Sequence, residues 1–209
     1  MVECPCKRHH DPVRVVLTGG PGAGKTAVLE LVRQHFCSHV EVLNEAASIL
    51  FSGGFQRGKT DAARAAAQRA IFHVQREQEA VAAAENGAAI ILCDRGTVDG
   101  LAYWPGPEDF WTAMGTTREH ELARYHAVLH LRTPPPSQGY NHRNPIRVET
   151  AAEAARIDGL IELAWAGHPR RNLVDSRASF LDKATEAIEL LRALMPECCS
   201  EHLRPKQGA

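Results

Sequence analysis

The sequence has no long hydrophobic run, few aromatic residues and almost no net charge. Aromatic side chains account for 6% of its 209 residues, and the formal net charge is −1. No apolar stretch approaches the roughly 20 residues that a membrane-spanning helix needs, and the N-terminal stretch MVECPCKRHHDP lacks the apolar centre of a signal peptide. A near-neutral charge gives no general attraction to nucleic acid or to an anionic membrane. We therefore expect a cytoplasmic protein without a membrane partner, and nucleic acid is disfavoured as a partner.

Zinc-ligand spacing is missing too, although the chain has six cysteines: Cys4, Cys6, Cys37, Cys93, Cys198 and Cys199. Cys37 and Cys93 lie in apolar stretches and are expected to be small core residues. The other four lie near the chain ends, and two of them precede a pair of histidines, which raises the question of a metal. Their spacing matches no familiar zinc pattern, and both ends look frayed. We therefore expect no metal centre there.

Apolar segments alternate with helical segments along the chain. The apolar runs predict strands at residues 13–18, 40–43, 88–93, 127–132 and 171–175. Periodicity and capping residues predict helices at residues 25–36, 61–85 and 150–165, and from Ser179 to about Pro196. This alternation predicts an α/β fold, a three-layer sandwich with a five-stranded parallel sheet. One domain is expected at residues 13–195, between flexible tails at residues 1–12 and 196–209.

The long helix at residues 61–85 is rich in alanine and has two distinct faces. Its predicted apolar stripe contains Ala63, Ala67, Ala70, Ile71, Val74 and Val81. The opposite face carries Arg64, Gln68, Phe72 and Gln75. Polar groups around an aromatic ring suit a planar heterocycle, and they suit an ordinary solvated face equally well.

A glycine-rich loop follows the first predicted strand. Gly19, Gly24, Lys25 and Thr26 fit the pattern G-x-x-x-x-G-K-[ST], with a strand before it and a helix after it. Glycines let backbone N–H groups crowd around phosphate oxygens, Lys25 neutralises the β- and γ-phosphates, and Thr26 offers a hydroxyl to Mg²⁺. The sequence therefore predicts a P-loop that binds a nucleoside triphosphate. Its expected contacts are Gly19, Gly20, Gly22, Ala23, Gly24, Lys25, Thr26 and Ala27.

The second element of a P-loop site is an acid at the end of a neighbouring strand. The run IILCDRG places Asp94 there, and we expect Asp94 to hold Mg²⁺ together with Thr26. Many hydrolytic P-loop ATPases have Glu directly after this acid to orient water, whereas this chain has Arg95. Small-molecule kinases often have Asp-Arg or Glu-Arg here, in which the acid holds the metal or activates the acceptor hydroxyl and the Arg neutralises phosphate charge. The guanine-reading N-K-x-D and T-K-x-D elements of GTPase switches are absent.

Further catalytic candidates come from outside these two motifs. Glu45 follows the second predicted strand and is expected to form a carboxylate pair with Asp94. One of the two would hold Mg²⁺ and the other would accept a proton from the attacking hydroxyl. Alternatively, Glu45 begins a helix and contacts only solvent. The segment TPPPSQGYNHRNP at residues 133–145 is expected to be irregular and to form a lid after the fourth strand. Arg143 and Arg147, in and just after this segment, are expected to stabilise the transferring phosphoryl group.

The acceptor pocket is expected between the long helix and two loops. Gln68 and Phe72 would contact the acceptor from the helix. Arg57, in the glycine-rich stretch FSGGFQRGKT, would meet an anionic group. Asp99 follows Asp94 closely enough to line the same pocket. These four residues form the predicted acceptor-binding set.

Several segments together resemble a known family. Over roughly residues 13–195 the chain is similar to the NadR-like AAA-domain family of P-loop proteins. The segments that carry this resemblance are LTGGPGAGKT, NEAA, GGF, CDRGTVDGLAYWPG, HLRTPP, HPRR and FLDK. That family includes the ribosylnicotinamide kinase domain of NadR and GTP-binding proteins linked to membrane-protein trafficking, and this chain looks nearer to its predicted ATPases and trafficking branch. The resemblance implies a kinase-like P-loop fold that binds Mg²⁺ and ATP or GTP.

The leading functional prediction is a P-loop kinase that transfers the γ-phosphoryl group of a nucleoside triphosphate to a small, nucleoside-like acceptor. The first alternative is a nucleotide-dependent switch or slow NTPase that acts through a protein partner. A lesser alternative is a polynucleotide 5′-kinase, since a basic channel is compatible with a neutral total charge.

Overall fold

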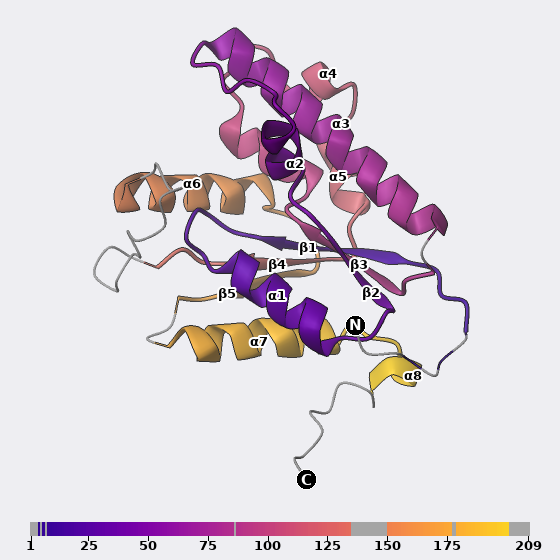
Figure 1. Ribbon diagram of the computed structural model, residues 1–209. Coiled ribbons are helices and arrows are strands. Elements are labelled where there is room, and N and C mark those ends of the chain that lie inside the picture. Colours follow the sequence, from indigo (N-terminus) through magenta and orange to yellow (C-terminus); the bar gives the residue numbers. More distant parts are fainter. Residues whose placement is uncertain are drawn as a thin grey trace.

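A parallel sheet forms the centre of the protein. The computed structural model describes residues 4, 6, 8–85, 87–134, 150–176 and 179–200. Its strands are β1 (Val13–Thr18), β2 (Val40–Leu43), β3 (Ile90–Asp94), β4 (Ala127–Leu131) and β5 (Arg171–Val174). They lie in the order β2-β3-β1-β4-β5, and every neighbouring pair is parallel (Figure 1). The predicted five-stranded parallel sheet is confirmed.

The register of the sheet places the two predicted nucleotide motifs side by side. Leu17 of β1 pairs with Asp94 of β3, and Thr18 pairs with His130 of β4. The glycine-rich loop leaves β1 directly after Thr18. Ligands of open α/β sheets bind beyond the carboxyl ends of the strands, so the loop and Asp94 share the edge where a nucleotide is expected.

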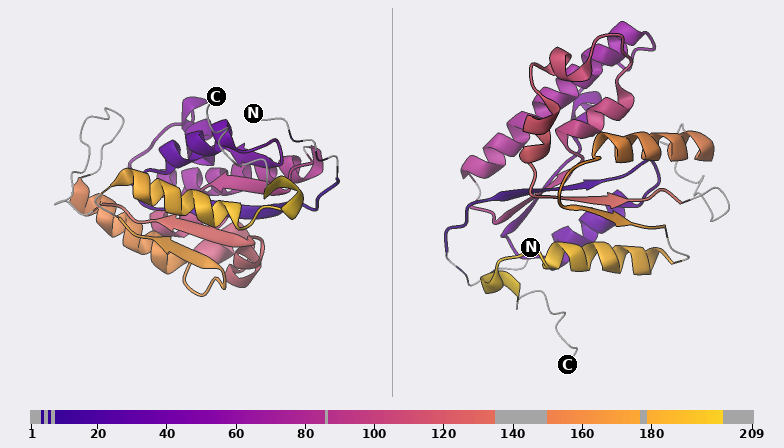
Figure 2. Two further views of the ribbon diagram at one scale, coloured as in Figure 1. Left: turned by 90° about the horizontal axis from the view of Figure 1, so that it is seen from below. Right: turned by 180° about the vertical axis from the view of Figure 1, so that it is seen from behind.

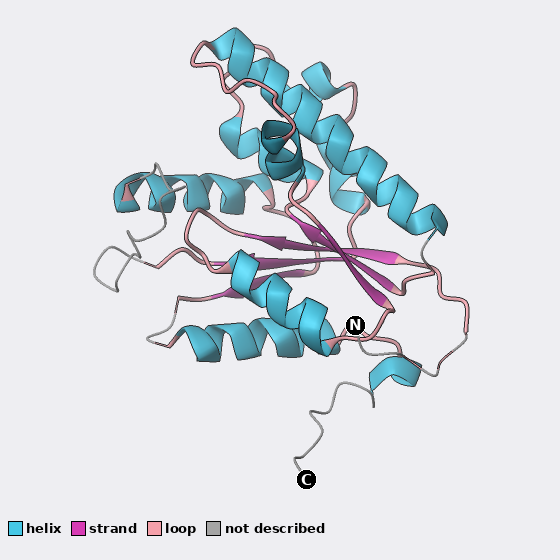
Figure 3. Ribbon diagram, in the orientation of Figure 1, coloured by secondary structure: helices cyan, strands magenta, loops and turns pink. Residues whose placement is uncertain are grey.

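Helices cover both faces of the sheet and complete a three-layer sandwich (Figures 2 and 3). On one face lie α1 (Lys25–His35) and α7 (Phe180–Arg192), which bury Leu29 and Leu191 against the strands. On the other lie α6 (Ala151–Ala164), α3 (Asp61–Glu85) and the 3₁₀ helix η1 (Thr97–Tyr103). Strands that are apolar on both faces are what this double covering requires.

Capping residues set the starts of α6 and α7 as expected. The Thr150 hydroxyl accepts the Glu153 N–H at 3.2 Å, and the Ser179 hydroxyl accepts the Leu181 N–H at 3.2 Å. Each bond satisfies one of the backbone donors that a helix N-terminus leaves free.

Within the described residues, η1 and four short α-helices have no counterpart among the predicted elements; the α-helices are α2 (Ala46–Ser52), α4 (Phe110–Met114), α5 (Arg118–Ala123) and α8 (Glu197–Ser200). Each has seven residues or fewer, so none is long enough to show a clear period of 3.6 residues. Because α2 ends at Ser52, the glycine-rich stretch FSGGFQRGKT, expected to be a loop from residue 51, becomes a loop only after Ser52. The lid predicted at residues 133–145 lies outside the described residues from residue 135 onward.

The buried face of α3 is not the predicted apolar stripe. Val81 was expected inside and is 52% exposed. Ala67 of the predicted stripe is buried, but the other buried residues of α3, Phe72, Gln75, Glu79 and Ala82, lie outside that stripe. Glu79 accepts the Tyr125 hydroxyl at 2.8 Å and lies 3.4 Å from Arg14. Alanine makes hydrophobicity nearly uniform around this helix, so its orientation depends on buried polar pairs, which sequence periodicity does not detect.

Within the part of the chain that the structure describes, no helix combines the length and the apolarity needed to cross a bilayer.

Candidate nucleotide and acceptor site

The glycine-rich loop has a backbone that requires its glycines. Gly19, Gly22 and Gly24 have φ angles of 136°, 80° and 96°, a region that side chains disfavour. Space is also restricted, because a Cβ atom on Gly19 would lie 2.1 Å from the carbonyl oxygen of Leu131. A Cβ atom on Gly24 would lie 2.5 Å from the Phe180 ring. Glycine therefore lets the loop close tightly between β1 and α1.

Lys25 lies in the first turn of α1, where its ammonium group bends back over the loop. Nζ donates to the carbonyl oxygens of Gly19, at 2.9 Å, and Gly20, at 3.4 Å. Burial and the nearby charge of Arg95 lower the pKa of Lys25 to about 8, against the opposing effect of Asp94 and Glu45. Among the described residues, the carboxylates of Asp94, Glu45 and Asp99 oppose this lowering, and a bound triphosphate would add further negative charge beside the ammonium.

Two buried side chains from distant helices hold the loop from behind. Asp158 of α6 accepts the Gly20 N–H at 2.7 Å and the Thr133 N–H at 3.1 Å. Lys183 of α7 donates to the Ala23 carbonyl oxygen at 2.8 Å, and burial lowers the pKa of Lys183 to about 8. The sequence analysis missed both residues. The FLDK segment contains Lys183, but no local pattern links it to the loop 160 positions away.

Asp94 ends β3 with one oxygen available for a metal. Its Oδ1 is buried and has no hydrogen-bond partner among the described residues. Burial raises the pKa of Asp94, with Lys25 working in the opposite direction. Thr26, the other predicted ligand, is exposed in the first turn of α1. A buried carboxylate oxygen without a donor suits Mg²⁺, which prefers oxygen ligands and keeps several waters.

Arg95 joins the nucleotide edge to the neighbouring helix α2. Its φ angle of 71° turns the chain sharply after Asp94. Nε donates to Glu45 Oε1 at 2.8 Å, and Nη1 donates to Asp99 Oδ1 at 3.3 Å. Burial alone would raise the pKa of Glu45, but Arg95 and the Ser48 hydroxyl outweigh it and lower that pKa. Glu45 is therefore a charged group held in place, and its solvent-only alternative is wrong.

Asp99, which accepts a hydrogen bond from Arg95, has further partners within the protein for both of its carboxylate oxygens. Oδ1 accepts the Thr18 hydroxyl, and Oδ2 accepts the Gly96 N–H at 2.9 Å and the Trp165 indole N–H at 3.1 Å. Together with Arg95 these donors occupy a carboxylate that is 3% exposed. Its contacts fit a positioning residue that links β1 to η1 better than a group free to bind an acceptor.

A cavity of about 400 Å³ opens beside the glycine-rich loop. Its described lining includes Pro21 of the loop, Glu45, Ser48 and Phe51 from the α2 segment, Arg57, Gln68, Ile71, Phe72 and Gln75 of α3, and Arg95, Asp99 and Tyr103 after β3. All four residues of the predicted acceptor-binding set thus line one cavity. The solvated-face alternative for α3 is wrong at Phe72 and Gln75, which are buried.

Within the cavity, polar and aromatic groups alternate. The Arg57 guanidinium lies 4.2 Å from the centre of the Phe51 ring. Phe72 packs edge-on against Phe110, with ring centres 6.2 Å apart. Gln68 also borders a second cavity, of about 460 Å³, which shares Phe51 and Arg57 with the first. Such mixed walls provide both stacking surfaces and hydrogen-bond groups.

Two of the predicted loop contacts differ in exposure. Ala23 is buried in the loop and Ala27 is exposed on α1. Arg143 and Arg147 lie outside the described residues. The structure therefore brings together the loop, Asp94, Glu45, Arg95 and the predicted acceptor set, and leaves the catalytic role of the lid arginines as a prediction.

The parallel sheet and its glycine-rich loop define a P-loop α/β fold, and solved structures share this fold. NadR in complex with NR superposes with a TM-score of 0.67 at 17% identity, over 89% of this chain and 52% of that chain. NadR in complex with NAD and AMP-PNP has a TM-score of 0.64 at 14% identity, over 95% of this chain and 52% of that chain. Thymidylate kinase from Candida albicans has a TM-score of 0.57 at 12% identity, over 93% and 94%.

A protein-family model described as an AAA domain matches residues 14–183. The chain therefore belongs to this AAA domain family, and the resemblance to NadR-like P-loop proteins is confirmed. It spans about half the length of the NadR chains, 52% in both structures. No curated protein matches the sequence.

Proposed function

We propose that the protein is a Mg²⁺-dependent phosphotransferase that moves the γ-phosphoryl group of ATP or GTP to a hydroxyl of a small, nucleoside-like acceptor. The observation that carries this proposal is the cavity that begins at Pro21 of the phosphate loop and continues between α2, α3 and η1. A hydrolase needs to admit only water beside the γ-phosphate, whereas a cavity of about 400 Å³ accommodates an organic acceptor.

The proposed roles follow from the contacts described above. Lys25 and the loop amides bind the β- and γ-phosphates. Asp94 and Thr26 hold Mg²⁺, which when bound neutralises phosphate oxygens. The proton acceptor must face the acceptor hydroxyl. Glu45 lines the cavity, whereas Asp94 is not among its lining residues, so we assign Glu45 as the proton acceptor. Arg95 holds Glu45 in place through its 2.8 Å ion pair.

In the proposed transfer, the acceptor oxygen bonds to the γ-phosphorus. The bond between that phosphorus and the β–γ bridging oxygen breaks, and the nucleoside diphosphate leaves. The acceptor's hydroxyl proton passes to Glu45. Arg143 and Arg147 are proposed to close over the transferring group and stabilise its charge.

A nucleoside-like acceptor is favoured by the chemistry of the cavity walls. A flat ring would stack near Phe72, and Gln68 offers both a donor and an acceptor to ring substituents. Two solved structures with the same fold are consistent with this, since NadR was solved in complex with NR and the other structure is a thymidylate kinase. At 17% and 12% identity these relatives support the fold alone, so the acceptor rests on the cavity.

The test is NTP consumption by the full chain with Mg²⁺, alone and with a panel of nucleosides, vitamins and 5′-hydroxyl oligonucleotides. ATP and GTP are compared, and each reaction is read for released phosphate and for phosphorylated product. We expect a phosphorylated small molecule whose formation requires the acceptor. Slow phosphate release that ignores every acceptor would contradict the proposal and favour a switch or slow NTPase. A phosphorylated oligonucleotide would favour a polynucleotide 5′-kinase.

A further inference from the structure

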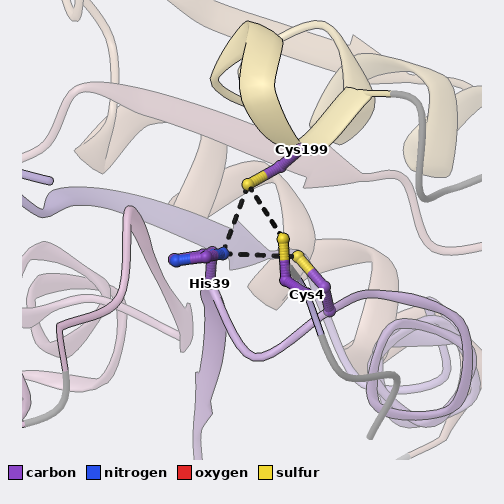
Figure 4. A group of neighbouring side chains, drawn as sticks. Cys4, His39 and Cys199 are labelled. Atoms are coloured by element: carbon purple, nitrogen blue, oxygen red, sulfur yellow. Dashed lines mark hydrogen bonds between the residues drawn. The ribbon is translucent and has the colours of Figure 1, made fainter. Parts of the chain in front are cut away.

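Four metal-binding side chains converge at the amino edge of the sheet, away from the nucleotide loop. They are Cys4, Cys37, His39 and Cys199, and their ligand atoms all lie within 4.8 Å of one another. Figure 4 shows Cys199 extending from α8 toward Cys4 and His39. These residues come from three stretches of the chain that are far apart in sequence, which is why spacing alone gave no zinc pattern.

The distances within this group match a tetrahedral zinc site. Cys4 Sγ lies 3.8 Å from Cys199 Sγ, and His39 Nδ1 lies 3.8 Å from Cys37 Sγ and 3.3 Å from Cys199 Sγ. Zinc bonds of about 2.3 Å to sulfur and about 2.0 Å to nitrogen, at tetrahedral angles, imply sulfur–sulfur separations of about 3.8 Å and sulfur–nitrogen separations of about 3.5 Å. A disulfide would need sulfurs about 2.05 Å apart.

The backbone fixes two of these ligands to the sheet. The Val40 N–H donates to the Cys37 carbonyl oxygen at 3.0 Å, closing the turn between α1 and β2. The His39 carbonyl oxygen accepts the N–H groups of Ala89 and Ile90, both at 2.9 Å. Cys37 and His39 therefore occupy fixed positions before any metal binds.

We propose that Cys4, Cys37, His39 and Cys199 bind one Zn²⁺ ion in a closed, structural site. Three thiolates and one imidazole form a ligand set typical of structural zinc. Cys37 is 1% exposed, Cys199 is 0% exposed and His39 is 8% exposed, so water has little access to a fifth position. The ion would join α8 and the segment around Cys4 to the start of β2.

A second group lies beside the first and provides an internal comparison. Cys6 Sγ and Cys198 Sγ lie 3.8 Å and 3.5 Å from His10 Nε2. This group has three ligands, all partly exposed, so it lacks the closed shell of the first. Cys198 Sγ is also 3.8 Å from Cys199 Sγ, which makes Cys198→Ser a close control for Cys199→Ser.

The first experiment measures zinc in the full chain without an affinity tag, purified under reducing conditions without chelators and then loaded with ZnCl₂ and desalted. We expect about one tightly bound Zn²⁺ per chain. Cys37→Ser and Cys199→Ser should lose at least about tenfold in zinc affinity, as expected when a thiolate ligand is removed. Cys93→Ser removes a buried core cysteine outside the group, and Cys198→Ser removes its neighbour, so both should keep the ion.

Spectroscopy of the unaltered chain keeps the proposal testable if a variant fails to fold. Co²⁺ in place of zinc should give thiolate charge-transfer bands and the strong visible bands of a tetrahedral site. A reduced wild-type chain that binds no zinc, or octahedral Co²⁺ spectra, would overturn the proposal. So would loss of zinc in Cys198→Ser together with its retention in Cys37→Ser, which would assign the metal to the second group. None of these readouts uses a nucleotide, so they are independent of the proposed phosphotransfer.

Discussion

The nucleotide half of the site and its acceptor half are built differently. In the nucleotide half, Gly20 and Ala23 are each tied to a buried charged group, Asp158 and Lys183, from helices on opposite faces of the sheet. In the acceptor half, Arg57 stacks on Phe51 in an exposed segment, and residues 53–60 are exposed throughout.

The difference separates two tasks. Triphosphate chemistry is the same for every member of a P-loop family, so a rigid, preorganised loop suits it. Recognition of one acceptor needs walls that differ between proteins, and side chains on loops and helix faces vary without disturbing the sheet. Variants in the two halves should therefore fail in different ways.

Lys25→Ala should have the largest effect. Removing the ammonium that neutralises the β- and γ-phosphates should lower kcat/KM by about 10³-fold or more. Thermal unfolding should stay close to that of the wild type, because the described hydrogen bonds of Lys25 go to carbonyl oxygens of the loop itself. Turnover by Lys25→Ala at the wild-type rate would contradict a catalytic role for the loop.

Asp94→Asn should follow, with a loss of about 10²- to 10³-fold in kcat and a higher Mg²⁺ requirement. The amide keeps the shape of the side chain but lacks the charge that holds the ion. Mg²⁺ titrations of activity measure both effects, and Asp182→Asn on the exposed start of α7 is the matched control. An unchanged metal response would make Asp94 structural.

The double variant Arg143→Ala/Arg147→Ala should lower kcat by about 10²-fold while changing nucleotide affinity only slightly. This outcome would place the two arginines in transition-state stabilisation, shared by both halves of the site. Steady-state rates and direct nucleotide titration separate the two quantities. A loss of affinity alone would place them in ground-state binding.

Gln68→Ala should affect the acceptor half only, raising the acceptor KM by about tenfold with nucleotide affinity unchanged. Gln34→Ala, an exposed glutamine on α1, is the matched control. Equal changes in nucleotide affinity and in the acceptor KM would contradict the separation of the site into two halves.

The smallest expected effect is an exchange of protons. The pKa of Lys25 is lowered to about 8, so near that pH half of the free molecules carry a neutral amine. A bound triphosphate favours the charged form, so binding at pH 8 should take up about half a proton. Nucleotide affinity should therefore fall as pH rises through 8. Calorimetry in buffers of different ionisation enthalpy measures this uptake, and Lys25→Arg should remove it because arginine stays charged.

Local signals predicted the sheet and the nucleotide loop well. The strands at residues 13–18 and 40–43 match β1 and β2, and the glycine pattern identified the loop. The residues behind that loop were not predictable, because Asp158 and Lys183 reach it only through the packing of α6 and α7. The α3 stripe was wrong at Val81 for a related reason, since pairing between buried polar groups outweighed the weak pattern of an alanine-rich helix.

The 3.8 Å contact between Cys4 and Cys199 bridges 195 positions of sequence. A link at this contact, through a metal ion or a crosslink, would close a loop that contains most of the described residues. Links that close long loops remove the most conformational entropy from the unfolded chain. A single link at this point would therefore stabilise the fold from a position far from the nucleotide loop.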